Sequence, residues 1–174
     1  MTHWFKNEAG FTLAELLVSI FIIGLLSSLF LVNYRNTNQR SELGVEKQKL
    51  VSNIRLAQNY SLGSKTYDNL ATPAGGWGVH FAQAEPAQYF IFADINSNRA
   101  YDSGEFKETK TLPSGITIDS LNPANNLDIV FLPPDPRVYV NGQEYANALI
   151  TLKENLNNST ASVSANLFGL IDAD

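Results

Sequence analysis

The sequence contains no cysteine, which excludes disulfide bonds, zinc–thiolate sites, iron–sulfur clusters and a cysteine nucleophile. It contains only two histidines, His3 and His80, too few for a histidine-rich metal site or a conventional catalytic triad. Charged residues make up 17% of the chain, below the roughly 25% of an ordinary soluble domain. The 174 residues fit one domain of modest size, and these shortages leave few residue types for nucleophilic or metal-dependent catalysis.

The charge that is present is unevenly distributed along the chain. Residues 35–65 carry six basic and two acidic residues, a net charge of +4. Residues 66–174 carry five basic and thirteen acidic residues, a net charge of −8. A basic stem therefore precedes an acidic body. Because nucleic acids bind proteins mainly through positively charged surfaces, nucleic acid is not the expected partner of this body.

One long apolar run stands near the N-terminus. Phe11–Val32 is 22 residues long and contains a single charge, at Glu15. A helix of this length, at about 1.5 Å per residue, spans a hydrocarbon core of about 30 Å. It is apolar on all faces, which argues against a buried helix of a soluble domain. It also exceeds the roughly 7–15 apolar residues of a signal peptide, and no small-x-small cleavage site follows it. The run therefore predicts a membrane-inserted helix.

The carboxylate of Glu15 is out of place in this run. An acid costs roughly 2.5–3.5 kcal/mol at the centre of a membrane and less near its edge. Either Glu15 lies at the edge and reaches the membrane interface, or it has a dedicated cationic partner, and the residue alone does not decide between the two.

The residues around Glu15 carry a family resemblance. The segment Gly10-Phe11-Thr12-Leu13-Ala14-Glu15-Leu16-Leu17-Val18, after a short polar leader from Met1 to Gly10, resembles the processing site of type IV pilins and type II secretion pseudopilins. The resemblance implies cleavage after Gly10 by a prepilin peptidase and methylation of the new amino terminus at Phe11. It also implies that Glu15 pairs with the terminal amine of a neighbouring subunit during filament assembly.

The topology in the membrane is predicted differently by two arguments. Basic residues are more numerous after the apolar run than before it, and the positive-inside rule alone would place the C-terminal side in the cytoplasm. The family resemblance implies the opposite, with the leader in the cytoplasm and the body outside. We expect the family topology, that is, a single-pass protein of the inner membrane that moves into a periplasmic or cell-surface filament on assembly.

The helical pattern continues beyond the apolar run. Apolar and small residues are spaced by 7, 4, 3 and 4 positions along one helix face, at Leu43, Leu50, Ile54, Ala57 and Ser61. Gly63 is a natural stop, so we expect one helix from Phe11 to Leu62. The stripe predicts that the second half of this helix packs on the body.

From Tyr67 the apolar pattern changes to period two, which predicts short strands. The expected strands are Trp77–Phe81, Gln88–Ala93, Ile116–Ile118, Leu127–Phe131, Ala148–Leu152 and Ala161–Leu167. Asn141-Gly142 predicts a hairpin-type turn, and Pro133-Pro134-Asp135-Pro136 a rigid connection outside the strands.

Together these elements predict an α+β, pilin-like fold in which a long N-terminal helix packs on an antiparallel β-sheet head. The expected organisation is a leader peptide at 1–10, a transmembrane and assembly helix at 11–32, an amphipathic helix at 33–63 and a β-rich head at 64–174. The body is similar to H-type minor pseudopilins and their pilus counterparts. The segments that carry this similarity are residues 52–62, 76–81, 150–152 and 166–171.

An acidic loop after the second expected strand has the spacing of a calcium site. Counted from Asp94, oxygen-bearing side chains fall at positions 1, 3, 5, 9 and 12, and a backbone carbonyl is available at position 7. The candidate ligands are Asp94, Asn96, Asn98, the carbonyl of Ala100, Asp102 and Glu105. This is the ligand spacing of a twelve-residue calcium loop.

Two departures leave a metal-free interpretation open. Position 6 is Arg99, where the sharp turn favours glycine, and strands rather than helices flank the loop. Asparagine and aspartate side chains also stabilise turns by bonding to their own backbone, so the segment fits an Asx-rich turn as well. If calcium binds, its expected role is to stiffen a surface loop. His80 stands alone in an expected strand and is interpreted as a structural residue.

The sequence therefore predicts a structural subunit, a minor pilin or pseudopilin of a type IV pilus or type II secretion-like filament. Its expected partners are other pilin or pseudopilin subunits, the prepilin peptidase and the inner membrane. The alternative is a binding module at the filament tip, for DNA uptake or for a surface ligand. A membrane-anchored enzyme is a third possibility, but no catalytic residue set supports it, and possible calcium is the only cofactor.

Overall fold

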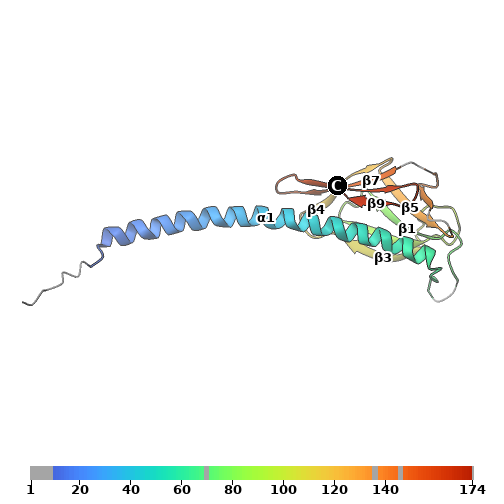
Figure 1. Cartoon of the computed structure of the whole chain (residues 1–174), viewed down its shortest axis with the longest axis horizontal. Helices are drawn as coiled ribbons and strands as arrows, with labels where there is room; N and C mark the ends of the chain where they lie inside the picture. Colours follow the sequence, from blue (N-terminus) through green and yellow to red (C-terminus); the bar gives the residue numbers. More distant parts are fainter. Residues whose placement is uncertain (1–9, 69–70, 135–136, 145–146, 174) are drawn as a thin grey trace, which may run out of the picture. The chain divides into compact units, whose positions relative to one another are not determined.

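The computed structural model describes residues 10–68, 71–134, 137–144 and 147–173. Over these residues it contains one helix and nine strands. The chain divides into two compact units, residues 1–38 and residues 39–174, and each unit is described here by itself. The helix contributes to both, its first part to the N-terminal unit and its second part to the β-rich head (Figure 1).

The helix, α1 (Leu13–Leu62), begins two residues later than the sequence predicted and ends at the predicted residue. Its C-terminus closes with two backbone bonds, from Ser64 to the Ser61 carbonyl at 3.1 Å and from Lys65 to the Tyr60 carbonyl at 2.9 Å. This is the Schellman pattern, in which one residue takes the left-handed conformation. That residue is Ser64, with φ of 50°, so the stop signal at Gly63 was displaced by one position.

The strands run through the rest of the chain in nine short segments. They are β1 (Trp77–Ala82), β2 (Gln88–Ala93), β3 (Phe106–Thr111), β4 (Ile116–Asn122), β5 (Asn126–Leu132), β6 (Arg137–Val140), β7 (Asn147–Glu154), β8 (Thr160–Asn166) and β9 (Ile171–Ala173). They form a five-stranded sheet in the order β3-β2-β1-β5-β6 and a four-stranded sheet in the order β4-β7-β8-β9. All pairings are antiparallel, which confirms the α+β prediction.

The predicted turn at Asn141-Gly142 is present, and both residues have positive φ, 49° and 76°. Val140 and Gln143 exchange backbone bonds across it. The strands on either side do not pair with each other, however, because β6 pairs with β5 and β7 belongs to the second sheet. The turn therefore passes the chain between sheets rather than closing a hairpin. Pro133-Pro134 forms a turn after β5, and Asp135-Pro136 lies outside the described residues.

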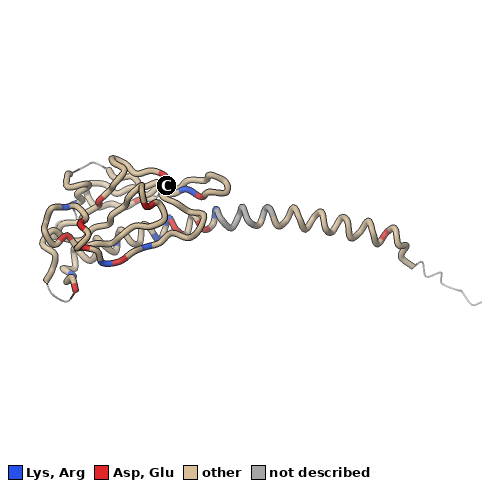
Figure 2. Tube along the Cα trace, turned by 180° about the vertical axis from the view of Figure 1, so that it is seen from behind, with Lys and Arg blue, Asp and Glu red and all other residues tan. Residues whose placement is uncertain are grey.

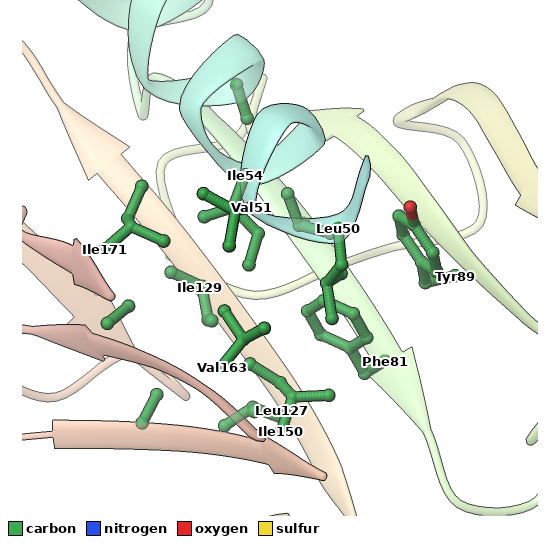
Figure 3. Packing of buried hydrophobic residues seen from close by; sticks show 14 of the residues in the cluster. Leu50, Val51, Ile54, Phe81, Tyr89, Leu127, Ile129, Ile150, Val163 and Ile171 are labelled. Atoms are coloured by element: carbon green, nitrogen blue, oxygen red, sulfur yellow. The ribbon is translucent and has the colours of Figure 1, made fainter. Parts of the chain in front are cut away.

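The core of the head lies between the second part of α1 and the strands. The predicted helix stripe is buried, with Leu50, Ile54 and Ala57 fully inaccessible, and Figure 3 shows this face pointing at side chains from both sheets. The stripe ends at Ser61, whose hydroxyl donates to the Phe131 carbonyl on β5. This close approach requires Gly76, since a Cβ there would lie 2.0 Å from the same carbonyl oxygen.

Candidate functional site

The predicted processing segment lies immediately before α1. Gly10 is exposed, and a Cβ built there would lie within 4 Å of no described residue other than its chain neighbours. Phe11 is 84% exposed and also precedes the helix. The bond between the two residues is therefore in an accessible, non-helical stretch, which is the local structure that a peptidase requires.

Thr12 caps the helix together with Glu15. The Thr12 hydroxyl accepts a bond from the Glu15 N–H at 3.2 Å. Glu15 returns the interaction, because its carboxylate accepts the Thr12 N–H and the Thr12 hydroxyl, each at 2.9 Å. This reciprocal pair is a capping box, which satisfies backbone donors that have no partner inside the helix.

The capping box gives Glu15 a role that the sequence analysis missed, although the Thr-x-x-Glu spacing was there to indicate it. Glu15 stands in the first turn of α1, where the helix dipole favours a negative charge. Its carboxylate is thus satisfied within its own chain before any partner arrives. The pairing with a neighbouring amine concerns a second subunit, and it stays a prediction.

The first part of α1 is a continuous apolar surface. Leu13–Leu31 is long and apolar enough to cross a membrane, with a mean hydropathy of 2.3, and all of it is exposed within the chain. Figure 2 shows one acidic position near the start of this stretch, whereas acidic and basic positions are interspersed over the head. Because water does not solvate so much apolar surface cheaply, this segment requires lipid or other apolar helices around it.

The acidic loop brings its predicted ligands into one hydrogen-bonded network. Asp94 is fully buried, and its carboxylate accepts the N–H groups of Asn98 at 3.2 Å and Arg99 at 2.9 Å. Glu105, also buried, accepts the N–H groups of Ile95 at 2.8 Å and Asn96 at 3.2 Å. The two ends of the loop are therefore fixed by carboxylate-to-backbone bonds.

The middle of the loop is held by Asp102. The side-chain amides of Asn96 and Asn98 both donate to one of its oxygens, at 2.7 Å each. Among the described residues, no group of three or more His, Cys, Asp or Glu side chains is arranged to hold a metal ion. A cation at this point would need the oxygens of Asn96 and Asn98, instead of their nitrogens, turned toward Asp102. The hydrogen bonds as described are those of the metal-free Asx-rich turn, and calcium binding stays a prediction.

The loop adopts the sharp turn despite Arg99 at its sixth position. Arg99 has φ of 63°, a left-handed conformation that costs a non-glycine residue about 1–2 kcal/mol. Its N–H bonds to Asp94, and its guanidinium lies 4.0 Å from the centre of the Tyr139 ring. These contacts offset the cost and anchor the loop to β6.

His80 is a structural residue, as predicted, and it belongs to a network that holds the loop. Its Nδ1 lies 2.5 Å from Asp128 Oδ1 on the neighbouring strand β5, and Asp128 Oδ2 accepts the Tyr101 N–H at 3.2 Å. The Tyr101 ring stacks on His80, 4.6 Å between centroids. Burial and the charges of Glu85, Asp128 and Glu105 raise the pKa of the Tyr101 hydroxyl. This network could not be predicted from the sequence, because it depends on the register between β1 and β5.

The loop also covers a second, smaller apolar cluster. Phe92, Val130 and Tyr139 are buried together, and Tyr101 packs against them. The five-stranded sheet is therefore covered on one face by α1 and on part of the other face by residues 94–105. A structural role for this loop follows with or without a metal.

Comparison with known proteins agrees with the geometry of the N-terminus. The profile described as "prokaryotic N-terminal methylation motif" matches residues 5–31, which contain the processing segment, the capping box and the apolar stretch. The chain is 26% identical over 132 residues to the type II secretion system core protein G of Klebsiella pneumoniae. That match covers 75% of this chain and 87% of the relative. No solved structure matched.

A methylation motif ahead of an apolar helix, followed by a helix-on-sheet head, is the arrangement predicted for a prepilin-type protein. Both matches support the predicted likeness to pilins and pseudopilins. The likeness is to structural subunits of type II secretion or type IV pilus systems, and it supports assembly with other such subunits.

Proposed function

We propose that the chain is made as a precursor, cleaved after Gly10 by a prepilin peptidase, methylated at Phe11 and assembled through α1 with its head outside the cytoplasm. The observation that carries the proposal is the exposed Gly10–Phe11 bond directly before a capped apolar helix. The mechanism needs no catalysis by this chain. Apolar helices pack laterally, and Glu15 exchanges its bonds to Thr12 for the charged amine of a neighbouring Phe11.

This proposal predicts the mass of the wild-type protein. Protein isolated from membranes should begin at Phe11, lack Met1–Gly10 and carry one added methyl group, as measured by intact-mass spectrometry. The same chain should be recovered in sheared filaments. A mature protein that retains its first ten residues would contradict the processing proposal, and absence from sheared filaments would contradict the assembly proposal.

Within the family we propose a minor subunit of H-type. The similarity of segments 52–62 and 76–81 to H-type minor pseudopilins supports this assignment, whereas the Klebsiella relative is a core protein G. Quantifying this chain in the sheared filaments tests the point, because a minor subunit is far less abundant than the main one. The role as a tip module for DNA gains no support from residues 66–174, which carry a net charge of −8.

We also propose that the loop 94–105 binds calcium, as its spacing predicted. A ligand that binds only the folded state stabilises it by about 2.7 kcal/mol at a hundredfold excess over Kd. The head should therefore melt several degrees higher in millimolar calcium than in chelator. Magnesium should substitute poorly, because it prefers a tighter shell at about 2.0–2.1 Å.

The variant for this test is Asp102→Asn, since Asp94 and Glu105 are buried and their loss would destabilise the metal-free head as well. It should remove the calcium-dependent shift and leave the melting temperature in chelator near that of the wild type. Asp119→Asn, an exposed acid on β4 outside the loop, is the matched control and should keep the shift. Equal melting temperatures of the wild-type head with calcium and with chelator would contradict calcium binding, and the loop would then be a metal-free Asx-rich turn.

A further inference from the structure

The four sheet edges of the head differ in how their outward backbone groups are used. On β6, Val138 and Val140 donate N–H groups to the carbonyls of Leu167 and Gln143. On β4, Ile118 donates to the Pro86 carbonyl, and on β9 the Ile171 carbonyl accepts from Arg55 of α1. On three of the four edges of the described sheets, outward backbone groups are therefore bonded to other parts of the chain.

The fourth edge, β3, is open at its C-terminal half. The register with β2 and the bond from Leu112 N–H to the Ala87 carbonyl turn the backbone groups of Glu108 and Lys110 toward β2. The groups of Thr109 and Thr111 consequently point away from the sheet, and within the described residues no bond is made to them. Every residue of β3 is exposed except Lys110, which is half-buried.

This open edge has room beside it. A groove of about 520 Å³ separates β3 from α1, and it is walled by Thr109 and Thr111 on one side and by Glu46, Lys49 and Ser52 on the other. Figure 1 shows β3 alongside the second part of α1. An added strand would lie in this groove and bond to the outward groups of β3.

We propose that the occupant is β3 of a second copy of this chain, paired antiparallel about a two-fold axis through Thr109. The charges of β3 support this choice. Centred on Thr109, such a pair sets Glu108 of each copy opposite Lys110 of the other, and the two Thr109 residues face each other. Glu108 and Lys110 already pair along the strand at 2.5 Å, so the four side chains form a ring of alternating charge.

The same charges disfavour the neighbouring registers. A shift of two residues in one direction sets Lys110 opposite Lys110, and in the other direction Glu108 opposite Glu108, and like charges directly opposite each other are destabilising. Charged side chains on an edge ordinarily prevent strand addition. In β3 the charged side chains favour one register of pairing. Both copies use the same strand in this contact, so the assembly stops at two copies.

The contact is small, so it requires a high local concentration of heads. Confinement of the chain to a membrane supplies this concentration. The inference goes beyond the proposed function and does not depend on cleavage or on filament assembly.

Because the chain has no cysteine, a single Thr109→Cys change tests the pairing in membranes that contain the full-length chain. Residues of a bonded antiparallel pair have Cα atoms about 5.5 Å apart, within the usual range of about 4.4–6.8 Å for a disulfide. Under mild oxidation this variant should form a reducible homodimer. Ser120→Cys, an exposed position on β4, is the control and should stay monomeric.

Charge reversal then tests the register. Adding Glu108→Lys to Thr109→Cys should lower the dimer yield about tenfold, because two attractive cross-strand pairs become repulsive. Adding Lys110→Glu as well restores opposite charges and should restore the yield. Three outcomes would overturn the proposal. Thr109→Cys and Ser120→Cys could give equal dimer yields, or Thr109→Cys could form a disulfide to a different protein in place of the homodimer. The third is a dimer yield that does not respond to the charge changes.

Discussion

A Gly10→Val chain should accumulate in the membrane with its ten-residue leader intact and should enter no filament. Peptide-bond hydrolysis requires the residue before the cut to fit the peptidase site, and the small Gly10 is the residue that the family resemblance places there. The structure separates this effect from misfolding, because a Cβ at Gly10 lies within 4 Å of no described residue other than its chain neighbours. A folding defect is therefore not expected.

Intact mass and an immunoblot of membrane and sheared fractions measure this outcome. Gly10→Ala is the matched control: it adds one methyl group at the same exposed position, keeps a small residue and should be cleaved. Gly24→Ala, at another glycine with open space around it, should be processed as the wild type is. Normal cleavage of Gly10→Val would place the processing bond elsewhere.

Glu15→Val should insert into the membrane as well as the wild type or better, and yet be absent from sheared filaments. Removing a carboxylate from the apolar segment lowers the cost of insertion, by up to roughly 2.5–3.5 kcal/mol at the membrane centre and less near its edge. The neighbouring amine, in turn, loses its charged partner during assembly. The structure adds a complication, since the change also removes the capping box with Thr12.

Glu15→Gln separates the two roles. A glutamine serves the capping box as a glutamate does, but it carries no charge for the neighbouring amine. If the intersubunit pair drives assembly, Glu15→Gln should fail nearly as completely as Glu15→Val while the helix start is preserved. If Glu15→Gln assembles normally and only Glu15→Val fails, capping is the role of Glu15 and the proposed pairing is wrong.

The sequence predicted those elements whose pattern is local. The apolar run, the stripe from Leu43 to Ser61 and the strands with alternating apolar residues all lie where they were expected. The strand β3 was missed because its sequence, Phe-Lys-Glu-Thr-Lys-Thr, has no buried face to mark it. The short strands β6 and β9 were missed as well: β6 follows the proline-rich connection, and β9 is three residues long.

The candidate sites also differ in whether a local sequence pattern predicts them. The T-x-x-E capping box was readable from spacing alone and was overlooked because Glu15 was considered only as a membrane acid. The contact of His80 with Asp128 was not readable, since residues 48 positions apart meet only through the register of β1 and β5. The division of the head into two sheets was also hidden, because strand spacing does not reveal which neighbour a strand chooses.

The continuity of α1 has a mechanical consequence. The helix runs without interruption from Leu13 to Leu62, and its last turns supply Leu50, Ile54 and Ala57 to the core of the head. A pulling force applied to the apolar end during extraction from a bilayer is therefore transmitted along hydrogen-bonded backbone into packed side chains. Such a force detaches the helix from the head only by breaking core contacts, which unfolds the head. The strength of the anchor and the stability of the fold are therefore limited by the same contacts.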